Sequence, residues 1–290
     1  MAAAFVVAWS SGFIGASLAD QTAVGVWRLL AWRYLATAAV LLLASFVVPV
    51  SRRAVTTVKC SDLLRQIALA LLSHVVFLGG VFLAAQQGLD AGLSALVCAL
   101  QPLLVTAAGR LVFFDRVRVR QWVGLVMALA GVALSVGGIS ATGLASVGLV
   151  VASLLGLSTS ALLERAWQPR IPVLLSLTIQ VCVAAVVFVL IALHDGGLGI
   201  PVTERLLWAI TWLVLLSGLG GYMTFTWCLR HLGATTTSTL LYLTAPMTML
   251  WAWFMFAQQP SVMQWTGLLV VLAGVACATK RTAKAASEPR

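Results

Sequence analysis

The sequence predicts an all-α polytopic membrane protein with ten transmembrane helices, arranged as two inverted five-helix repeats. Three observations lead to this fold class. The 290 residues are 61% hydrophobic and only 9% charged, whereas about a quarter of the residues of a soluble domain are charged. The apolar residues fall into ten runs, each near the roughly 20 residues that a helix needs to cross a bilayer. The second half of the chain also repeats the first.

The ten spans take up nearly the whole chain and leave no room for a sizeable soluble domain. We expect them at about residues 2–19, 29–49, 65–85, 91–113, 121–138, 145–164, 172–193, 205–229, 234–256 and 262–279. The five cysteines are scattered without a C-x-x-C pair, so we expect no disulfide, no metal site and no cofactor.

The internal repeat has a period of about half the chain. Gln121-Trp122-Val123-Gly124 returns as Gln264-Trp265-Thr266-Gly267 after 143 residues, and Pro102 returns as Pro246 after 144. We therefore expect a first repeat at residues 1–140, a second at 145–280 and a tail at 281–290. Five is an odd number of spans, so the second copy must enter the membrane upside down relative to the first.

Small residues line one face of spans five and ten, the best-matched parts of the repeat. These stripes predict close helix packing rather than contact with a substrate. They consist of Gly124, Ala128, Gly131 and Ser135 in span five, and Gly267, Gly274 and Ala278 in span ten.

Charge is distributed unequally between the two sides of the predicted bundle. One set of connections carries fourteen basic residues, and the opposite set carries only Arg28 and Arg205. By the positive-inside rule both termini are expected to be cytoplasmic, so the net charge of +10 indicates a lipid bilayer as partner, not nucleic acid. The fourteen are Arg52, Arg53, Lys59, Arg65, Arg116, Arg118, Arg120, Arg165, Arg170, Arg230, Lys280, Arg281, Lys284 and Arg290.

Signatures of an enzyme are absent from the sequence. It contains no H-E-x-x-H, no G-x-S-x-G and no phosphate-binding glycine loop, and its three histidines have no metal-ligand spacing. We do not expect this chain to be an enzyme.

Two prolines lie near the middle of spans four and nine. Pro102 and Pro246 each remove a helical hydrogen bond, and in hydrocarbon the released carbonyl must find another partner. A single proline of this kind can be a packing kink. Two at equivalent repeat positions favour a substrate site near the bilayer midplane.

The candidate substrate-contacting residues are polar, aromatic or helix-breaking groups at bilayer depth. For the hydroxyl residues the alternative is a hydrogen bond within their own helix. For His74 the alternatives are a hydrogen-bonded structural residue or a group that contacts substrate or a proton. The candidates are Trp9, Ser10, Ser11, His74, Ser94, Gln101, Pro102, Ser158, Tyr222, Tyr242, Thr244 and Pro246.

Arg33 and Arg110 are two further charges inside predicted spans. Each lies about a turn from a span end, so snorkelling to the membrane surface can satisfy both side chains. For Arg110 the alternatives are an ion pair with Asp115 or attraction of an anionic substrate. No Asp or Glu is predicted at the midplane, which leaves a largely uncharged cavity suited to a zwitterionic or weakly amphipathic solute.

The pattern resembles the EamA-type branch of the drug/metabolite transporter superfamily over nearly the whole chain. The matching stretches are Trp9-Ser10-Ser11-Gly12-Phe13, Arg33, Gly92 to Phe114 around Pro102, and Gln121 through Gly131, with copies from Ser217 to Ala278. The resemblance implies a secondary transporter or facilitator of the bacterial inner membrane, working by alternating access, with export of amino acids as the most common activity.

Two other functions stay open at this point. A lipid-linked sugar or nucleotide-sugar carrier would need several basic residues facing the cavity, and the spans offer Arg33 and Arg110. A non-transporting membrane scaffold would depend on the glycine stripes and not on the cavity residues. The sequence leaves monomer and homodimer as alternatives.

Overall fold

The computed structural model describes residues 1–22, 24–56, 58–114, 117–137, 141–168, 171–199 and 202–279. It does not describe the side chains of residues 141–142, 229–230 and 233–235. Within this part of the chain, ten helical segments are long and apolar enough to cross a membrane. The predicted tail at 281–290 lies outside the described residues, as do Arg116, Arg170 and Lys280, and so does the side chain of Arg230.

The five spans of the first repeat are formed by eight helical elements. They are α1 (Ala2–Asp20), α2 (Val26–Val47), α4 (Cys60–Ala70) with η1 (Leu71–Val76) and α5 (Phe77–Gln86), α6 (Ala91–Cys98) with α7 (Gln101–Val112), and α8 (Val119–Val136). A short helix that the sequence analysis did not predict, α3 (Pro49–Val55), connects α2 to α4.

The second repeat follows the same plan. It consists of α9 (Ala141–Trp167), α10 (Val173–His194), α11 (Glu204–Thr211) with η2 (Trp212–Gly220) and α12 (Gly221–Tyr242), α13 (Thr244–Phe256) and α14 (Val262–Thr279). Span eight ends within α12 at Cys228, and span nine begins in it at Thr236. All ten predicted spans are confirmed. The largest difference is at span three, which starts at Cys60 instead of residue 65.

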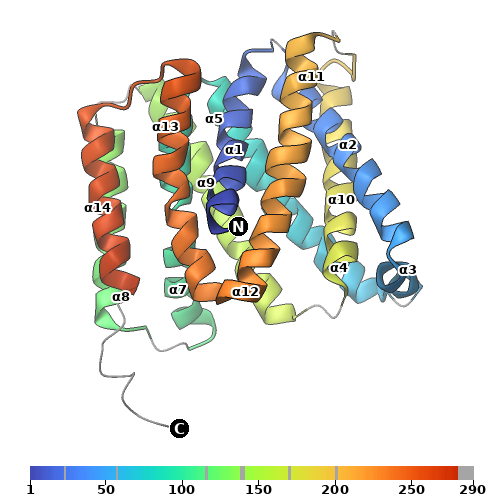
Figure 1. The fold of residues 1–290 in the computed structure, drawn as a ribbon, viewed down its shortest axis with the longest axis horizontal. Helices are drawn as coiled ribbons and strands as arrows, with labels where there is room; N and C mark the ends of the chain where they lie inside the picture. Colours follow the sequence, from blue (N-terminus) through green and yellow to red (C-terminus); the bar gives the residue numbers. More distant parts are fainter. Residues whose placement is uncertain are drawn as a thin grey trace.

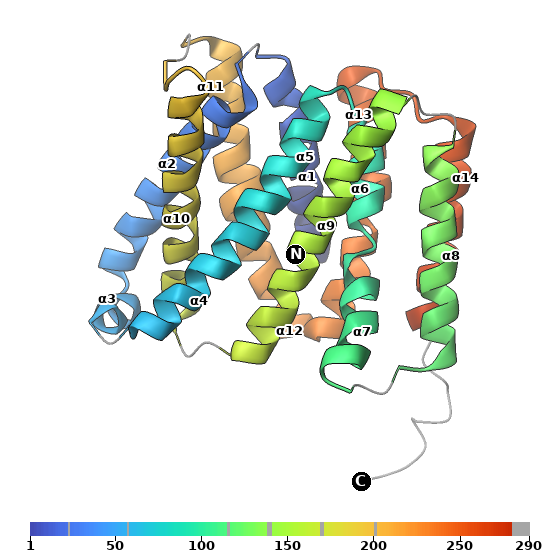
Figure 2. The ribbon, with the colours of Figure 1, turned by 180° about the vertical axis from the view of Figure 1, so that it is seen from behind.

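The helices form a bundle with one equivalent pair at each end. The pair α8 and α14 (spans five and ten) packs together at one end, the pair α2 and α10 (spans two and seven) packs at the other, and the remaining spans lie between them (Figures 1 and 2). Large apolar side chains on the outside are exposed, as expected of a surface that contacts lipid. They include Leu43, Phe46, Val126, Leu155, Leu190, Phe254 and Leu269.

The glycine stripes of spans five and ten meet face to face, as predicted. A Cβ atom added to Gly131 would lie 2.6 Å from the carbonyl oxygen of Gly267, and one added to Gly274 would lie 2.6 Å from that of Gly124. The repeat offset of 143 converts one of these contacts into the other. The seam between α8 and α14 therefore lies on the pseudo-two-fold axis that relates the inverted repeats.

Both proline-containing spans are broken where proline chemistry requires it. Helix α6 ends at Cys98 and helix α12 ends at Tyr242, each four residues before a proline. Pro102 and Pro246 have no N–H to donate to the carbonyls of those two residues. The predicted interruption of spans four and nine is confirmed.

Spans three and eight contain a second pair of irregularities that the sequence analysis did not predict. The wider π-helical segment η1 covers Leu71–Val76, and an offset of 144 places its copy at residues 215–220, inside η2. A π-helical turn inserts an extra residue into an α-helix and is often found at functional sites. Four central spans are therefore irregular, two in each repeat.

The α8–α14 seam generates a stability prediction. Gly131→Ala places a methyl group against the backbone of α14, with Val271 Cγ2 also only 2.9 Å away. The helices must separate, and we expect a loss of about 1–3 kcal/mol with a lower melting temperature of the purified protein in detergent.

Gly148→Ala on α9 is the matched control, because an added Cβ there meets nothing within 4 Å. Alanine also has the higher helix propensity, so the control should melt at or above the wild-type temperature. Equal melting temperatures for both variants would contradict the close packing of this seam.

Candidate functional site

A cavity of about 750 Å³ lies between the two repeats. Its wall comes from α1, α2, η1, α5 and α7 of the first repeat and from α9, α10, η2 and α12 of the second. A space of this size is typical of a small-molecule site. Its apolar lining includes Trp9, Phe13, Phe77, Leu157 and Phe225, and its polar lining includes Arg33, Tyr34, His74, Gln180 and Ser217.

The cavity reaches only one end of the bundle. Gln168 and Ile171, in the connection between α9 and α10, belong to its lining. This connection lies at the same end as α3 and the start of α8 (Figure 2), the end that carries most of the basic residues. None of the described residues in the connections at the opposite end lines the cavity.

Tryptophans close the opposite end. Trp212 Nε1 donates a hydrogen bond to the carbonyl oxygen of Ser11 at 3.0 Å, and its ring lies 5.5 Å from that of Trp251. Trp32 Nε1 donates to the carbonyl oxygen of Leu198 at 3.0 Å. The two hydrogen bonds join α1 to η2 and α2 to the α10–α11 connection, so both link the two repeats, while the ring contact joins η2 to α13 within the second repeat.

A chain of hydrogen bonds crosses from the first repeat to the second beside the cavity. The Tyr34 hydroxyl lies 2.9 Å from His74 Nδ1, and His74 Nε2 lies 3.3 Å from Gln180 Oε1. Gln180 Nε2 in turn donates to Gln66 Oε1 at 2.7 Å. Because a carbonyl oxygen only accepts, His74 Nε2 donates to Gln180. A neutral imidazole then accepts the Tyr34 proton at Nδ1, so protein groups engage both ring nitrogens.

Arg33 also lines this cavity, and its placement corrects the snorkelling expectation. The side chain is only 6% exposed, and the guanidinium carbon lies 5.5 Å from the ring centres of both Tyr34 and Phe82. The side chain turns into the bundle because α2 presents this position to the other helices. Arg110, by contrast, is exposed near the basic end, as snorkelling requires.

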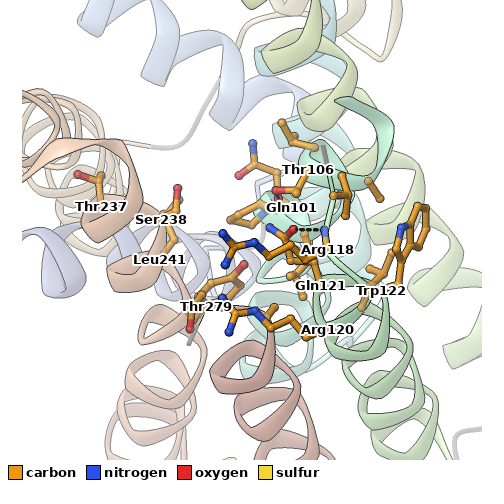
Figure 3. Close-up of a pocket in the computed structure, with 18 of the residues that line it drawn as sticks. Gln101, Thr106, Arg118, Arg120, Gln121, Trp122, Thr237, Ser238, Leu241 and Thr279 are labelled. Atoms are coloured by element: carbon orange, nitrogen blue, oxygen red, sulfur yellow. Dashed lines mark hydrogen bonds between the residues drawn. The ribbon is translucent and has the colours of Figure 1, made fainter. Parts of the chain in front are cut away.

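A second cavity of about 580 Å³ adjoins the first at the basic end. Gln101, Phe225 and Leu241 belong to both linings. In Figure 3, Arg118 and Arg120 extend from the start of α8 toward the part of the chain that carries Thr237 and Ser238. The backbone N–H of Arg118 donates to Gln121 Oε1 at 2.8 Å, the dashed line in Figure 3. This second space is therefore bordered by positive charge.

Six of the predicted site residues line one or both of these cavities. The larger cavity includes Trp9, His74, Gln101 and Tyr222, and the smaller one includes Gln101, Pro102 and Tyr242. Gln101 lies in the shared wall, and its side-chain amide makes no hydrogen bond with the residues that the structure describes. Its placement agrees with the prediction that a buried amide beside a proline faces a cavity.

The other six predicted residues lie outside both linings. Ser10, Ser11 and Thr244 turn back onto their own helices and donate to the carbonyls of Val7, Ala8 and Leu241, which is the packing alternative. The hydroxyls of Ser94 and Ser158 are buried without a hydrogen-bond partner among the described residues. Pro246 ends the preceding helix, and its ring does not line either cavity.

Sequence reasoning missed most of the hydrogen-bonded chain. Tyr34, Gln66, Ser176 and Gln180 were not singled out, although Ser176 also donates to Gln66 Oε1, at 2.6 Å. The signal available was the one used for Gln101, since an amide inside an apolar span needs a partner. Gln66 and Gln180 are both such amides, 114 residues apart in the sequence.

The comparisons with known proteins agree with this architecture. The model of the EamA-like transporter family matches the chain twice, over residues 1–137 and 144–280. A solved structure described only as a crystal structure of a protein is similar, with 18% identity and a TM-score of 0.66, over 96% of this chain and 94% of that chain. At this identity the likeness shows the fold alone. No curated protein matches the chain.

The hydrogen-bonded chain generates a prediction for Tyr34→Phe. The change keeps the ring but removes the donor to His74 Nδ1, and an unsatisfied buried acceptor costs about 1–3 kcal/mol. We expect a lower melting temperature in detergent. In Tyr242→Phe, by comparison, the lost hydroxyl makes no hydrogen bond with the described residues, so this variant should melt like wild type. An unchanged melting temperature for Tyr34→Phe would show that the contact contributes nothing.

Proposed function

The chain belongs to the EamA-like transporter family, and we propose that it is a secondary transporter of a small organic metabolite such as an amino acid. Members of this family are membrane transporters of small molecules, and the ten apolar spans make this chain a multi-pass membrane protein. Three points go beyond family membership and are proposed here: the class of solute, the mechanism of alternating access and the location in the bacterial inner membrane.

The observation that carries the proposal is the cavity between the inverted repeats. Helices of both repeats form its wall, so a rocking movement of one repeat against the other would change its access from one side to the other. Its volume suits an amino acid, and its lining combines aromatic rings and neutral polar groups with Arg33 and Glu164.

The irregular helices support alternating access. Residues in broken or π-helical segments absorb backbone changes that a regular helix resists. The breaks after Cys98 and Tyr242 and the segments η1 and η2 occur at equivalent positions of the two repeats. Each repeat therefore has irregular backbone at equivalent positions. An exchange between a state open to one side and a state open to the other needs such positions in both repeats.

We place the basic end of the bundle in the cytoplasm of a bacterial cell, at the inner membrane, by the positive-inside rule. The large cavity then faces the cytoplasm, while Trp212 and Trp32 close the outer side. A cytoplasm-facing cavity is the state in which an exporter takes up its solute, and export is the direction that we propose. One chain encloses the whole cavity, so we propose that a monomer suffices for transport.

One alternative keeps the transport mechanism but changes the solute. A nucleotide-sugar or lipid-linked sugar carrier needs several cations around phosphate groups. Arg118 and Arg120 border the smaller cavity, and this is the observation that favours it. Among the described residues of the larger cavity, however, Arg33 is the only Lys or Arg. A multiply charged phosphate ester there would be poorly neutralised, so the amino acid is the better fit.

The experiment is flux in proteoliposomes that contain the purified protein and a panel of labelled amino acids. Leu157→Trp places a large side chain in the wall of the main cavity. The indole would occupy space that the solute needs, and a loss of about 1–3 kcal/mol of solute binding corresponds to a reduction of flux by roughly five- to 150-fold.

Leu155→Trp on the same helix is the control, because Leu155 is 55% exposed on the outer surface; its flux should equal that of wild type. If both variants fold and carry solute equally, the cavity is not the transport route. A wild-type protein that moves no member of a broad metabolite panel would favour the non-transporting scaffold.

A further inference from the structure

Arg33 is a buried charge near the middle of an apolar bundle. It is the eighth residue of α2, about 10 Å along the helix from its start, and only 6% of the side chain is exposed. At the centre of a membrane helix an unpaired charge costs at least about 2.5–3.5 kcal/mol, and Arg33 lies about a third of the way along α2. Placing Arg33 at this position is therefore unfavourable unless another group compensates its charge.

The residues that the structure describes supply no counter-ion for this guanidinium. Arg33 makes no side-chain hydrogen bond and no ion pair with any residue that the structure describes, and its Nη1 is buried without a partner. The rings of Tyr34 and Phe82, at 5.5 Å, hold the group by cation–π contact. Neither ring carries a negative charge, so the positive charge stays unneutralised.

The neighbouring polar groups do not provide Arg33 with a negative charge. Tyr34 and Gln180 engage both ring nitrogens of His74, and an imidazole carries no negative charge in either of its two common protonation states. Glu164 also lines the cavity, but it lies three residues before α9 ends at the basic side and makes no ion pair with Arg33. Arg33 is thus a cation without an ion-pair partner among the described residues, and it lies in the wall of a space that admits small molecules.

We propose that Arg33 binds the carboxylate of the transported solute; this inference rests on the proposed transport function. A guanidinium presents two parallel N–H donors that match the two oxygens of one carboxylate. The flanking rings keep the planar group from rotating. One cation neutralises one carboxylate and would leave a phosphate dianion half-paired. The cavity therefore selects solutes that carry a carboxylate.

The test uses matched acid and amide pairs in the same proteoliposome assay. L-Phenylalanine, L-leucine and L-threonine are each compared with their amides, which keep the shape and the ammonium group but lose the negative charge. We expect the amides to compete at least roughly tenfold more weakly than the acids. Inorganic phosphate should not compete; if it competes as well as the acids, the carboxylate assignment is wrong.

Variants at Arg33 separate a binding role from a structural one. Arg33→Gln should lower transport of the acids by at least roughly tenfold. Arg33→Lys keeps the positive charge but loses the paired, coplanar N–H donors of the guanidinium. Its transport rate should lie between those of Arg33→Gln and wild type. Arg110→Gln is the control, because Arg110 is exposed and lines neither cavity; its flux should stay at the wild-type level.

Thermal stability supplies an independent readout. Removing an uncompensated buried charge should leave the melting temperature of Arg33→Gln equal to or above that of wild type, while the stabilisation by added acid disappears. A melting temperature well below wild type, with solute stabilisation retained, would assign Arg33 a structural role and overturn the inference.

The outcomes also distinguish the two proposals. If wild type carries acids and amides equally well, transport stands and carboxylate recognition by Arg33 is wrong. If wild type carries none of the six compounds and none of the wider panel, the transport function itself fails.

Discussion

Hydrocarbon offers no hydrogen-bond partner to a polar group, and this constraint decides where each polar residue of the ten spans can lie. The lipid-facing surface carries side chains such as Leu155, Leu190 and Phe254. The polar residues turn inward, where they bond to their own helix or join the chain from Tyr34 to Gln66. Arg33 and Gln101, which make no side-chain hydrogen bond with the described residues, line the cavities, whereas the unpaired hydroxyls of Ser94 and Ser158 lie outside both linings. The binding space is therefore the place where the polarity of the spans is concentrated.

The same constraint explains how a rigid frame and a movable centre coexist in one bundle. At one end, backbone-to-backbone contact between α8 and α14 leaves no room for a methyl group at Gly131 or Gly274, and such a seam resists deformation. In the centre, the helices are interrupted after Cys98 and Tyr242 and widened at η1 and η2. Freed backbone groups are tolerated there because they lie inside protein or beside a cavity, not in lipid.

The sequence was sufficient to predict the features that depend on residue type and number. Hydropathy located the ten spans, the odd number of spans per repeat implied inversion, and the two prolines located the breaks at Cys98 and Tyr242. The direction in which a side chain faces was not predictable, because hydropathy reports depth but not rotation about the helix axis. Ser10 and Ser11 therefore lie outside the cavity linings, whereas Arg33 points inward. The π-helical segments depend on packing between helices, and no residue type marks them.

The central claim is that one cavity between the repeats takes up solute from the cytoplasm. Ser217 lines it, in η2 close to the tryptophan closure. The most direct measurement is the rate at which a small membrane-impermeant thiosulfonate reacts with the cysteine of Ser217→Cys. The variant is made in a protein that lacks the five native cysteines. The reagent should react from the cytoplasmic face of inverted vesicles, more slowly when a transported solute is present. Val202→Cys is the control, because Val202 lies at the opposite end of the bundle and is 75% exposed. This cysteine should react only from outside. Reaction of Ser217→Cys from outside alone, or a rate that no solute changes, would contradict the account.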